Sequence, residues 1–196
     1  MNYDHWRHYL RGWRLHFFNQ PEAAYDAYVL AFHHAPDDIQ TARHLAGIAG
    51  EKKRWDVAES WFEKVIALEP EDASTWFNLG FVREQAGKID VALTAFDEAV
   101  RLKLNLDRAW YGKGLAHARL GDHDAAAAAL EKSVELQPMN DGGWYQLGMA
   151  YHHARRPEEV TRVVKRLVDF KPQRAKLLVQ DAERADLKPL VPELLY

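Results

Sequence analysis

Ten histidines are the first residues in this chain whose chemistry suggests a site, because imidazole is a common metal ligand. The clearest groupings are His5 with His8, His33 with His34, and His152 with His153. Adjacent residues on a helix point about 100° apart, and no HExxH motif or linked carboxylate cluster accompanies these histidines. We therefore expect no metal site and no cofactor.

A second chemical candidate is the Gly112, Lys113, Gly114 triplet, which superficially suggests a phosphate-binding loop. It lacks the upstream glycine of such a loop and the Ser or Thr that would hold magnesium. The chain also contains no cysteine, so neither a disulfide scaffold nor thiol chemistry is available. We find no set of catalytic residues and predict that the protein is not an enzyme.

The elements that carry these residues follow a repeat of 34 residues. Its clearest markers are Pro36, Pro70, Pro138 and Pro172, with Leu104 at the vacant place, and a parallel series of Ala24, Ala58, Ala92, Ala126 and Val160. A fixed period of this length is typical of one supersecondary unit copied several times, in which each copy needs a neighbour to bury its apolar face. The pattern predicts a stack of helical pairs.

Polar residues at fixed places in the repeat predict where the helices begin. An acid occurs at the eighteenth place of every copy, where it favours a helix amino terminus: Glu22, Asp56, Asp90, Asp124 and Glu158. Two residues after three of the prolines stand Asp38, Asp72 and Asn140, which we predict to cap the first helix of the next pair. Small residues at the eighth place are expected to let two antiparallel helices approach closely, and large residues at the twenty-fourth place are expected to fill the space between copies.

These columns resemble the signature of the tetratricopeptide repeat family over residues 5–174. The matching residues are Trp76, Leu79, Gly80, Ala92, Phe96 and Ala99, and then Trp144, Leu147, Gly148, Tyr151 and Pro172. The resemblance implies an all-α fold, a right-handed α-solenoid of five tetratricopeptide helix pairs plus a C-terminal capping helix. The repeats would span residues 5–38, 39–72, 73–106, 107–140 and 141–174.

Beyond the repeats, an amphipathic stretch at residues 175–187 predicts the capping helix, with Leu177, Leu178, Ala182 and Ala185 on one face. Residues 188–196 form an apolar tail with Pro189 and Pro192, which we expect to leave the helix. At 196 residues, 47% hydrophobic and without a low-complexity linker, the chain is expected to form one domain.

The net charge of −3 is spread over interspersed acids and bases, so the sequence offers no electrostatic footprint for nucleic acid. The first ten residues lack the apolar core of a secretory signal, and no later run is long enough to span a membrane. We expect a cytoplasmic protein that binds neither nucleic acid nor membrane.

Function is then expected from the surface of the stack. In the family that this chain resembles, the first helices line a concave groove, and the second, fifth, ninth, twelfth and thirteenth places face into it. The groove residues implied here are Tyr9, Trp13, Arg43, Phe77, Asn78, Phe81, Arg108, Tyr111, Tyr145 and Met149. Exposed rings rimmed by charge are typical of a partner site. The alternative is that the fifth place turns toward the neighbouring repeat and belongs to the interior.

Part of this set resembles the carboxylate clamp with which some family members bind the free carboxy terminus of chaperones. Arg43, Asn78 and Arg108 occupy three of its five places, and Gly47 and Gly112 occupy the other two. Guanidinium groups with an amide can receive a carboxylate through charge-assisted hydrogen bonds. The alternative is that the arginines pair with nearby acids such as Asp107 or are solvated.

We predict a protein–protein interaction adaptor or co-chaperone-like module that binds a peptide or protein segment in its groove. The partner would carry apolar anchors and an acidic group or C-terminal carboxylate. The alternative is a self-assembling scaffold, a homo-oligomer in which the tail fills the groove of its own or a neighbouring chain.

Overall fold

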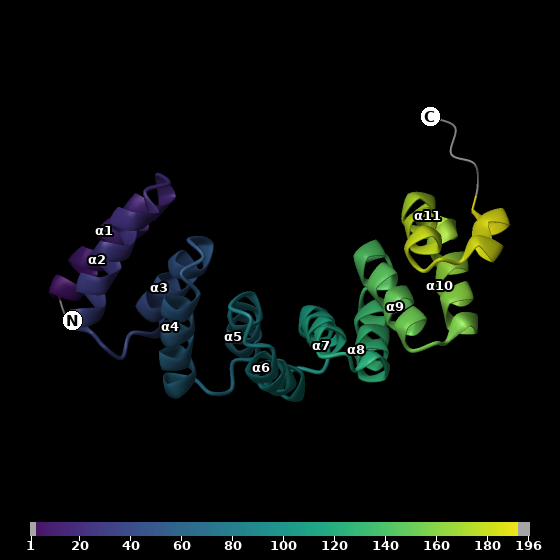
Figure 1. Ribbon diagram of the computed structural model, residues 1–196. Coiled ribbons are helices and arrows are strands. Elements are labelled where there is room, and N and C mark those ends of the chain that lie inside the picture. Colours follow the sequence, from purple (N-terminus) through teal and green to yellow (C-terminus); the bar gives the residue numbers. More distant parts are fainter. Residues whose placement is uncertain (1–2, 192–196) are drawn as a thin grey trace. The chain divides into compact units, whose positions relative to one another are not determined.

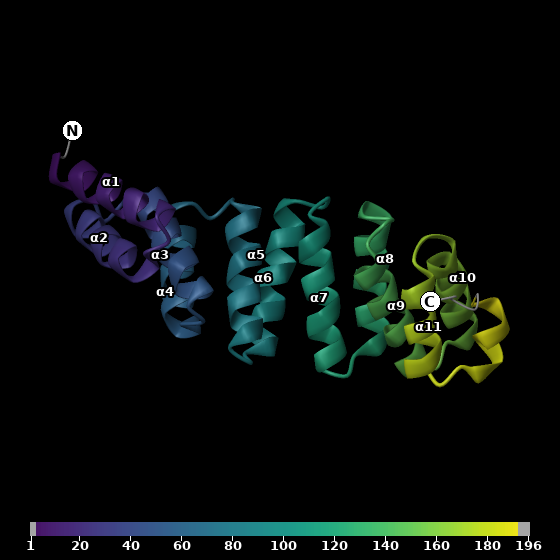
Figure 2. The ribbon, with the colours of Figure 1, turned by 90° about the horizontal axis from the view of Figure 1, so that it is seen from above.

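The computed structural model describes residues 3–191, and every regular element in that range is helical. The chain divides into two compact units, unit 1 at Met1–Leu102 and unit 2 at Lys103–Tyr196. Within each unit, consecutive helices lie side by side in pairs (Figures 1 and 2). This arrangement confirms the predicted all-α fold of consecutive helix pairs.

The helices alternate between a first and a second member of each pair. Unit 1 contains α1 (Tyr3–Phe17), α2 (Pro21–His34), α3 (Ile39–Glu51), α4 (Trp55–Leu68), α5 (Ala73–Gln85) and α6 (Ile89–Leu102). Unit 2 contains α7 (Asp107–Arg119), α8 (His123–Leu136), α9 (Asp141–His153), α10 (Pro157–Phe170), α11 (Pro172–Asp181) and the 3-10 helix η1 (Ala185–Leu190). The second helix of each repeat begins one residue before the acid that was predicted to mark its start.

The predicted helix caps are confirmed. The side chain of Asp38 accepts a hydrogen bond from the backbone N–H of Thr41, Asp72 accepts one from Ser74, and Asn140 accepts one from Gly143. Each bond satisfies one of the donors that the first turn of a helix leaves unpaired. These caps therefore fix where α3, α5 and α9 begin.

The turn inside each pair depends on a backbone conformation that the sequence pattern did not reveal. The fifteenth place of every repeat has a positive φ: Asn19, Lys53, Gly87, Gly121 and Arg155, with φ between 55° and 81°. Two of the five are glycines, which adopt this left-handed region without steric cost. The other three accept some strain so that the second helix can fold back on the first.

The tryptophans at the fourth place bind to the series of prolines. The indole Nε1 of Trp76 donates to the carbonyl of Pro70 at 2.7 Å, and that of Trp144 donates to Pro138 at 2.9 Å. Trp110 makes the same bond to Leu104 at 2.8 Å, at the vacant place in the proline series. The bond needs only the carbonyl of that turn, so the proline itself is dispensable there.

The glycines at the eighth place allow a large side chain of the partner helix to lie against the backbone. A Cβ built on Gly80 would lie 2.7 Å from ring carbons of Phe96, and one on Gly114 would lie 2.6 Å from Cγ of Leu130. Since Phe96 and Leu130 belong to the second helix of the same repeat, the twenty-fourth place fills the space within a pair. The expectation that it fills the space between copies is therefore corrected.

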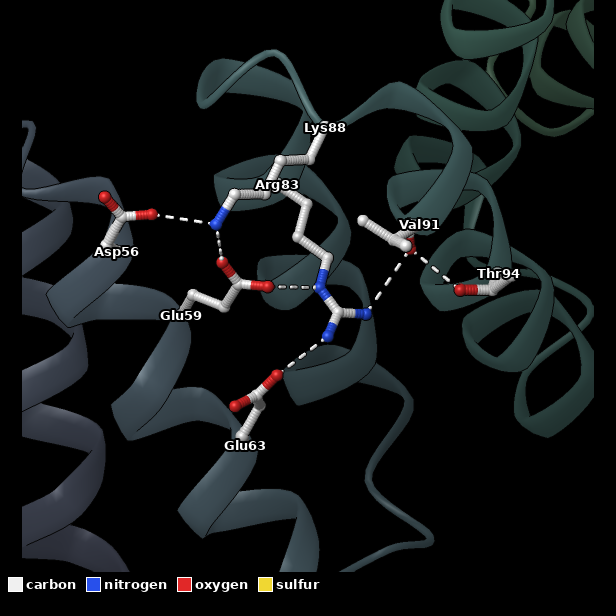
Figure 3. A network of polar contacts seen from close by, with 7 residues as sticks. All are labelled: Asp56, Glu59, Glu63, Arg83, Lys88, Val91 and Thr94. Carbon is white, nitrogen blue, oxygen red and sulfur yellow. Dashed lines mark hydrogen bonds and ion pairs between the residues drawn. The ribbon is translucent and has the colours of Figure 1, made fainter.

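A polar network joins α4 to α5 and to the turn after it in unit 1 (Figure 3). Glu59 accepts a hydrogen bond from Arg83 Nε at 2.8 Å and one from Lys88 Nζ at 2.7 Å. Burial by itself would raise the pKa of Glu59, but the bonds from Lys88 and Arg83 outweigh it and lower that pKa. Arg83 also binds Glu63 at 2.8 Å, so one guanidinium connects two turns of α4.

The carboxy-terminal end differs from the predicted capping helix at residues 175–187. Helix α11 begins at Pro172, whose fixed φ suits the first turn, and ends at Asp181, because the chain reverses at Glu183 with φ 53°. Leu178 and Ala182 are buried as expected, whereas Leu177 and Ala185 are exposed. Pro189 was expected outside any helix but lies in η1, and residues 192–196 lie outside the described part.

Leu178 explains why the fifth repeat carries only Val164 at the twenty-fourth place, where earlier repeats carry Tyr, Phe or Leu. A Cβ on Gly148 would collide with the Leu178 side chain, so α11 fills the place that Phe96 or Leu130 fills in earlier pairs. Leu178 and Val164 are both fully buried in one cluster with Leu187 of η1. Helix α11 thus covers the apolar side of α9 and α10.

Candidate peptide-binding groove

In unit 1 the predicted groove residue Tyr9 is half-buried and packs against the interior. Its hydroxyl forms a 3.1 Å hydrogen bond with Nε2 of His44, and its ring meets the edge of the Tyr28 ring with centroids 5.6 Å apart. Burial raises the pKa of the Tyr9 hydroxyl, and the negative charge of Asp38 adds to this effect. Tyr9 therefore joins α1 to α2 and α3.

Arg43 is bound by two carboxylates of its own unit. One guanidinium nitrogen lies 2.6 Å from Glu69 and 2.7 Å from Asp72. Burial alone would raise the pKa of Asp72, but hydrogen bonds from Thr75 and Ser74 and the charge of Arg43 together lower it. A ligand carboxylate would have to compete with these two acids, which are not the Asp107 suggested by the sequence.

The other unit 1 candidates lie on α5. The ring of Phe77 is half-buried, with its centroid 6.1 Å from that of Phe96, and Asn78 is half-buried beside it in sequence. Phe81 is 44% exposed and meets the edge of Trp55 at 6.5 Å. The fifth place is thus neither sealed in the core nor fully open, while the ninth place is open.

In unit 2, Tyr145 is fixed by contacts with α11. Its hydroxyl donates to Asp181 at 2.6 Å, and the guanidinium of Arg174 lies 5.5 Å from its ring centroid. Burial and the bond to Asp181 raise the pKa of Tyr145 to about 12, so the hydroxyl keeps its proton at any physiological pH. Tyr111 is half-buried on α7, and Arg108 is exposed at the start of the same helix.

A hollow of about 450 Å³ lies between α7, α8 and α9, and we call it the α7–α9 hollow. Its lining consists of Leu115, Ala118, Arg119, His123, Tyr145, Gln146, Met149, Ala150 and His153. Tyr145 and Met149 were both predicted as groove residues, and the structure brings them together here. Trp13 lies on α1 and does not line this hollow. The clamp residues Arg43, Asn78 and Arg108 belong to both units, so the clamp stays a prediction.

The lining of the α7–α9 hollow combines apolar and basic side chains. Leu115 and Met149 provide apolar surface, whereas Arg119, His123 and His153 carry or can carry positive charge. The rings of His123 and His153 stack with centroids 4.9 Å apart. Burial lowers the pKa of His153, and the neighbouring His123 and His152 lower it further, so this imidazole is neutral at pH 7.5.

Arg119, His123 and His153 were not predicted as groove residues from the sequence, although a signal was present for two of them. Arg119 and His153 both occupy the thirteenth place of their repeats, which faces the groove in the family that the chain resembles. In the sequence, His153 stands out only as one of an adjacent pair. Within residues 3–191, no group of three His, Asp or Glu side chains is arranged to hold a metal ion.

The comparisons identify the family. The sequence profile described as Tetratricopeptide repeat matches residues 45–103, 77–141 and 111–175, together more than half of the chain. The chain therefore belongs to the tetratricopeptide repeat family, whose members are protein–protein interaction modules and generally not enzymes. No curated protein sequence matches the chain.

Solved structures of the same fold agree with this assignment. A crystal structure of MamA matches with a TM-score of 0.80 at 19% identity, covering 100% of both chains. YrrB, described as a tetratricopeptide protein with an unusual peptide-binding site, matches with a TM-score of 0.78 at 21% identity, covering 90% of each chain. PilF of Pseudomonas aeruginosa matches with a TM-score of 0.68 at 16% identity, covering 97% of this chain and 93% of that one.

No helix within residues 3–191 has the length and apolar character needed to cross a lipid bilayer.

Proposed function

We propose that the protein is a non-enzymatic adaptor that binds a peptide or protein segment of a partner, and that the α7–α9 hollow receives an apolar side chain of that segment. The observation that carries this proposal is the meeting of Leu115, Tyr145 and Met149 in one concave site. The structure of YrrB, with its peptide-binding site on the same fold, supports a peptide as the ligand class.

The size and lining of the α7–α9 hollow suit one apolar anchor with a charged neighbour. Its volume of about 450 Å³ falls in the range of roughly 300–1,000 Å³ that is usual for ligand pockets. Leu115 and Met149 offer adaptable apolar contacts, because a thioether side chain repacks around different shapes. The Tyr145 ring is already held by Asp181, so it needs little ordering when a ligand binds.

The basic side chains of the lining favour an acidic residue near the anchor. Arg119 carries a positive charge at neutral pH, and its effect on a ligand carboxylate is strongest where water is partly excluded. His153 is neutral at pH 7.5 and gains a proton on acidification, in the company of His123, His152 and Arg119. Binding of an acidic peptide should therefore tighten as the pH falls below 6.5 and through the lowered pKa of His153.

A calorimetric titration with two capped hexapeptides tests this function. One peptide has a central Phe with Asp two residues away, and the other has Lys in place of the Asp. We expect the Asp peptide to bind more tightly than the Lys peptide. The variant Met149→Glu, which places a carboxylate in the lining of the hollow, should lose binding of the Asp peptide.

The matched control is Met139→Glu, because Met139 is 66% exposed and lies outside the hollow. It introduces the same charge on the same residue type and should leave the affinity unchanged. Equal affinities of both variants and the unaltered chain, with circular dichroism showing all three folded, would contradict the assignment of the hollow.

The clamp remains a separate proposal for the same function. If Arg43, Asn78 and Arg108 receive a terminal carboxylate, then a peptide with a free carboxy terminus should bind more tightly than its amide. Arg108→Ala should remove that difference.

The position of residues 185–191 bears on the alternative in which the C-terminal tail fills the groove of its own or a neighbouring chain. Helix η1 packs against α10 and α11, and Val191 lies against the same apolar cluster, so this part of the tail does not line the α7–α9 hollow. Self-assembly through the tail would then use the exposed Leu190 or residues 192–196, and the latter lie outside the described part. Removing those five residues and measuring solution mass tests it, since a loss of oligomers would favour the scaffold.

A further inference from the structure

The first helix of unit 1 carries an apolar stripe with helix-packing spacing on its exposed side. The stripe consists of Tyr3, Trp6, Leu10, Trp13 and Phe17. Its members are three and four residues apart in alternation, which is the spacing of the seam between two packed helices. All five side chains are between 46% and 76% exposed, so none belongs to the core of unit 1.

The opposite side of α1 already holds its contacts inside the unit. His5 is 4% exposed, with its Nδ1 3.1 Å from the carbonyl oxygen of Ala31, and Gly12 lies against the ring of Tyr28. The exposed stripe is therefore additional apolar surface. The open surface beside it is lined by α1 residues alone, among them Tyr3, Trp6 and Leu10 of the stripe.

A row of three arginines borders the stripe on one side. Arg7, Arg11 and Arg14 are all exposed, and the only acid in the helix is Asp4. Within residues 3–191, none of the three guanidinium groups takes part in an ion pair. On the other side of the stripe, Tyr9 and His16 are engaged by α3.

Comparison with the second repeat shows that arginine is unusual at these three places. One period later, their places are taken by Thr41, Leu45 and Ile48, which are completely buried. Charged residues at these places of α1 disfavour an ordinary apolar contact with a further repeat, because desolvating three guanidinium groups without acidic partners costs more than the contact returns. A helix that lies on the stripe and brings carboxylates to the arginines avoids that cost.

We propose that α1 is a docking site for an amphipathic helix of another protein whose apolar side chains enter the stripe and whose Asp or Glu residues face Arg7, Arg11 and Arg14. This surface is distinct from the α7–α9 hollow. The spacing of the stripe specifies a helical partner, and the one-sided charge fixes which flank of that helix is acidic.

Two other occupants fit less well. In a two-fold antiparallel pair of α1 helices, the arginine flank of one copy would face the same flank of the other, which sets like charges together. In a parallel pair, the arginines would face the flank that α3 already covers. A lipid surface would attract the arginines and rings, but it would not require the alternating spacing.

The test uses a fluorescein-labelled peptide of three heptads, with Leu at both apolar positions of each heptad and Glu along one flank, and a second peptide with Lys in place of Glu. Fluorescence anisotropy with the full chain should show binding of the Glu peptide and at least tenfold weaker binding of the Lys peptide. Raising NaCl from 50 to 500 mM should weaken binding of the Glu peptide, because the ion pairs between its Glu residues and the arginines of α1 would be exposed to solvent.

Two variants and one control assign the effect to α1. The triple variant Arg7→Glu, Arg11→Glu, Arg14→Glu should reverse the preference between the peptides, and Leu10→Asp should abolish binding of both. Leu104→Asp alters a Leu that is 74% exposed in a loop and should have no effect. Circular dichroism of each variant confirms that it is folded.

Several results would overturn the proposal. One is equal binding of both peptides, and another is binding of neither. A third is binding of phosphatidylglycerol vesicles without binding of the Glu peptide. A dimer that Leu10→Asp converts to a monomer would show that a second copy is the occupant. Because Met149→Glu should leave binding of the Glu peptide unchanged, failure of the α7–α9 hollow and failure of this site are distinguishable.

Discussion

Replacing Gly80 by Ala tests the packing rule that holds each helix pair together. In the structure, a Cβ at Gly80 would lie 2.7 Å from two ring carbons of Phe96 and 3.1 Å from a third. Contacts below 3.0 Å require a shift, and the Phe96 ring is fully buried, so it must move against its neighbours in the core. Forcing extra atoms into such a core typically costs about 1–3 kcal/mol.

The same substitution also removes a helix-interior glycine, which is worth roughly 0.5–1 kcal/mol in favour of Ala. Gly47→Ala isolates this gain, because Gly47 is an exposed helical glycine and, apart from its chain neighbours and its own helix backbone, no atom lies within 4 Å of the position that its Cβ would take. We expect Gly47→Ala to stabilise unit 1 by roughly that amount and Gly80→Ala to destabilise it. The difference between the two variants equals the overpacking cost, about 1–3 kcal/mol.

Equilibrium urea denaturation, followed by far-UV circular dichroism, measures both variants. The chain contains one natural comparison: Ala46 takes the place of Gly80 in the second repeat, and its partner Phe62 is 7% exposed whereas Phe96 is fully buried. If Gly80→Ala proved as stable as Gly47→Ala, the pair would accommodate a methyl group without strain, and the close-packing argument would be refuted.

Three further predictions concern turns, caps and pH. Lys53→Gly should stabilise the protein by about 1 kcal/mol, because residue 53 has φ 56°, and an unchanged thermal midpoint would count against strain at that turn. Asn140→Ala should cost about 1 kcal/mol by removing the cap of α9, and denaturation that matches the unaltered chain would show that the cap contributes nothing. The folded-state pKa of Glu59 lies below its ordinary value of 4.5, so its contribution to stability is present above pH 4.5 and is lost as the pH falls through the lower folded value. The stability of Glu59→Gln should therefore vary less between pH 5 and pH 3 than that of the unaltered chain, and parallel pH curves would contradict this.

The regular part of the fold follows from the sequence because each repeat makes the same contacts. Trp76 and Trp144 both bind a carbonyl six residues upstream, and Asp38 and Asp72 both cap a helix, so the period of 34 residues carries physical meaning at each place. The turn residues were missed since only two of the five are glycines.

The end of the chain was harder to predict because it leaves the period. Helix α11 starts at Pro172, three residues earlier than expected, and Leu178 substitutes for the large residue that the fifth repeat lacks. No column of the repeat contains that information, because Leu178 lies on α11, outside the five repeats, and packs against Gly148 of α9.

The groove was only partly predictable for an electrostatic reason. Arg43 occupies a clamp place in the sequence, but Glu69 follows the end of α4 and Asp72 precedes the start of α5. Their carboxylates come within 2.6 and 2.7 Å of the Arg43 guanidinium only in the folded unit. The family resemblance already implies that the thirteenth place, occupied by Arg119 and His153, faces the groove. Its importance emerged when the structure placed both beside Met149.

The most direct measurement of the proposed function uses the methionines as reporters. The chain has three, so labelling with ¹³C-methyl methionine gives a spectrum with few signals, in which single substitutions assign Met139 and Met149. On addition of the Asp hexapeptide, the Met149 signal should shift with saturable dependence on peptide concentration while the Met139 signal stays in place. A peptide that binds the chain without moving the Met149 signal would contradict the claim that the α7–α9 hollow is the binding site.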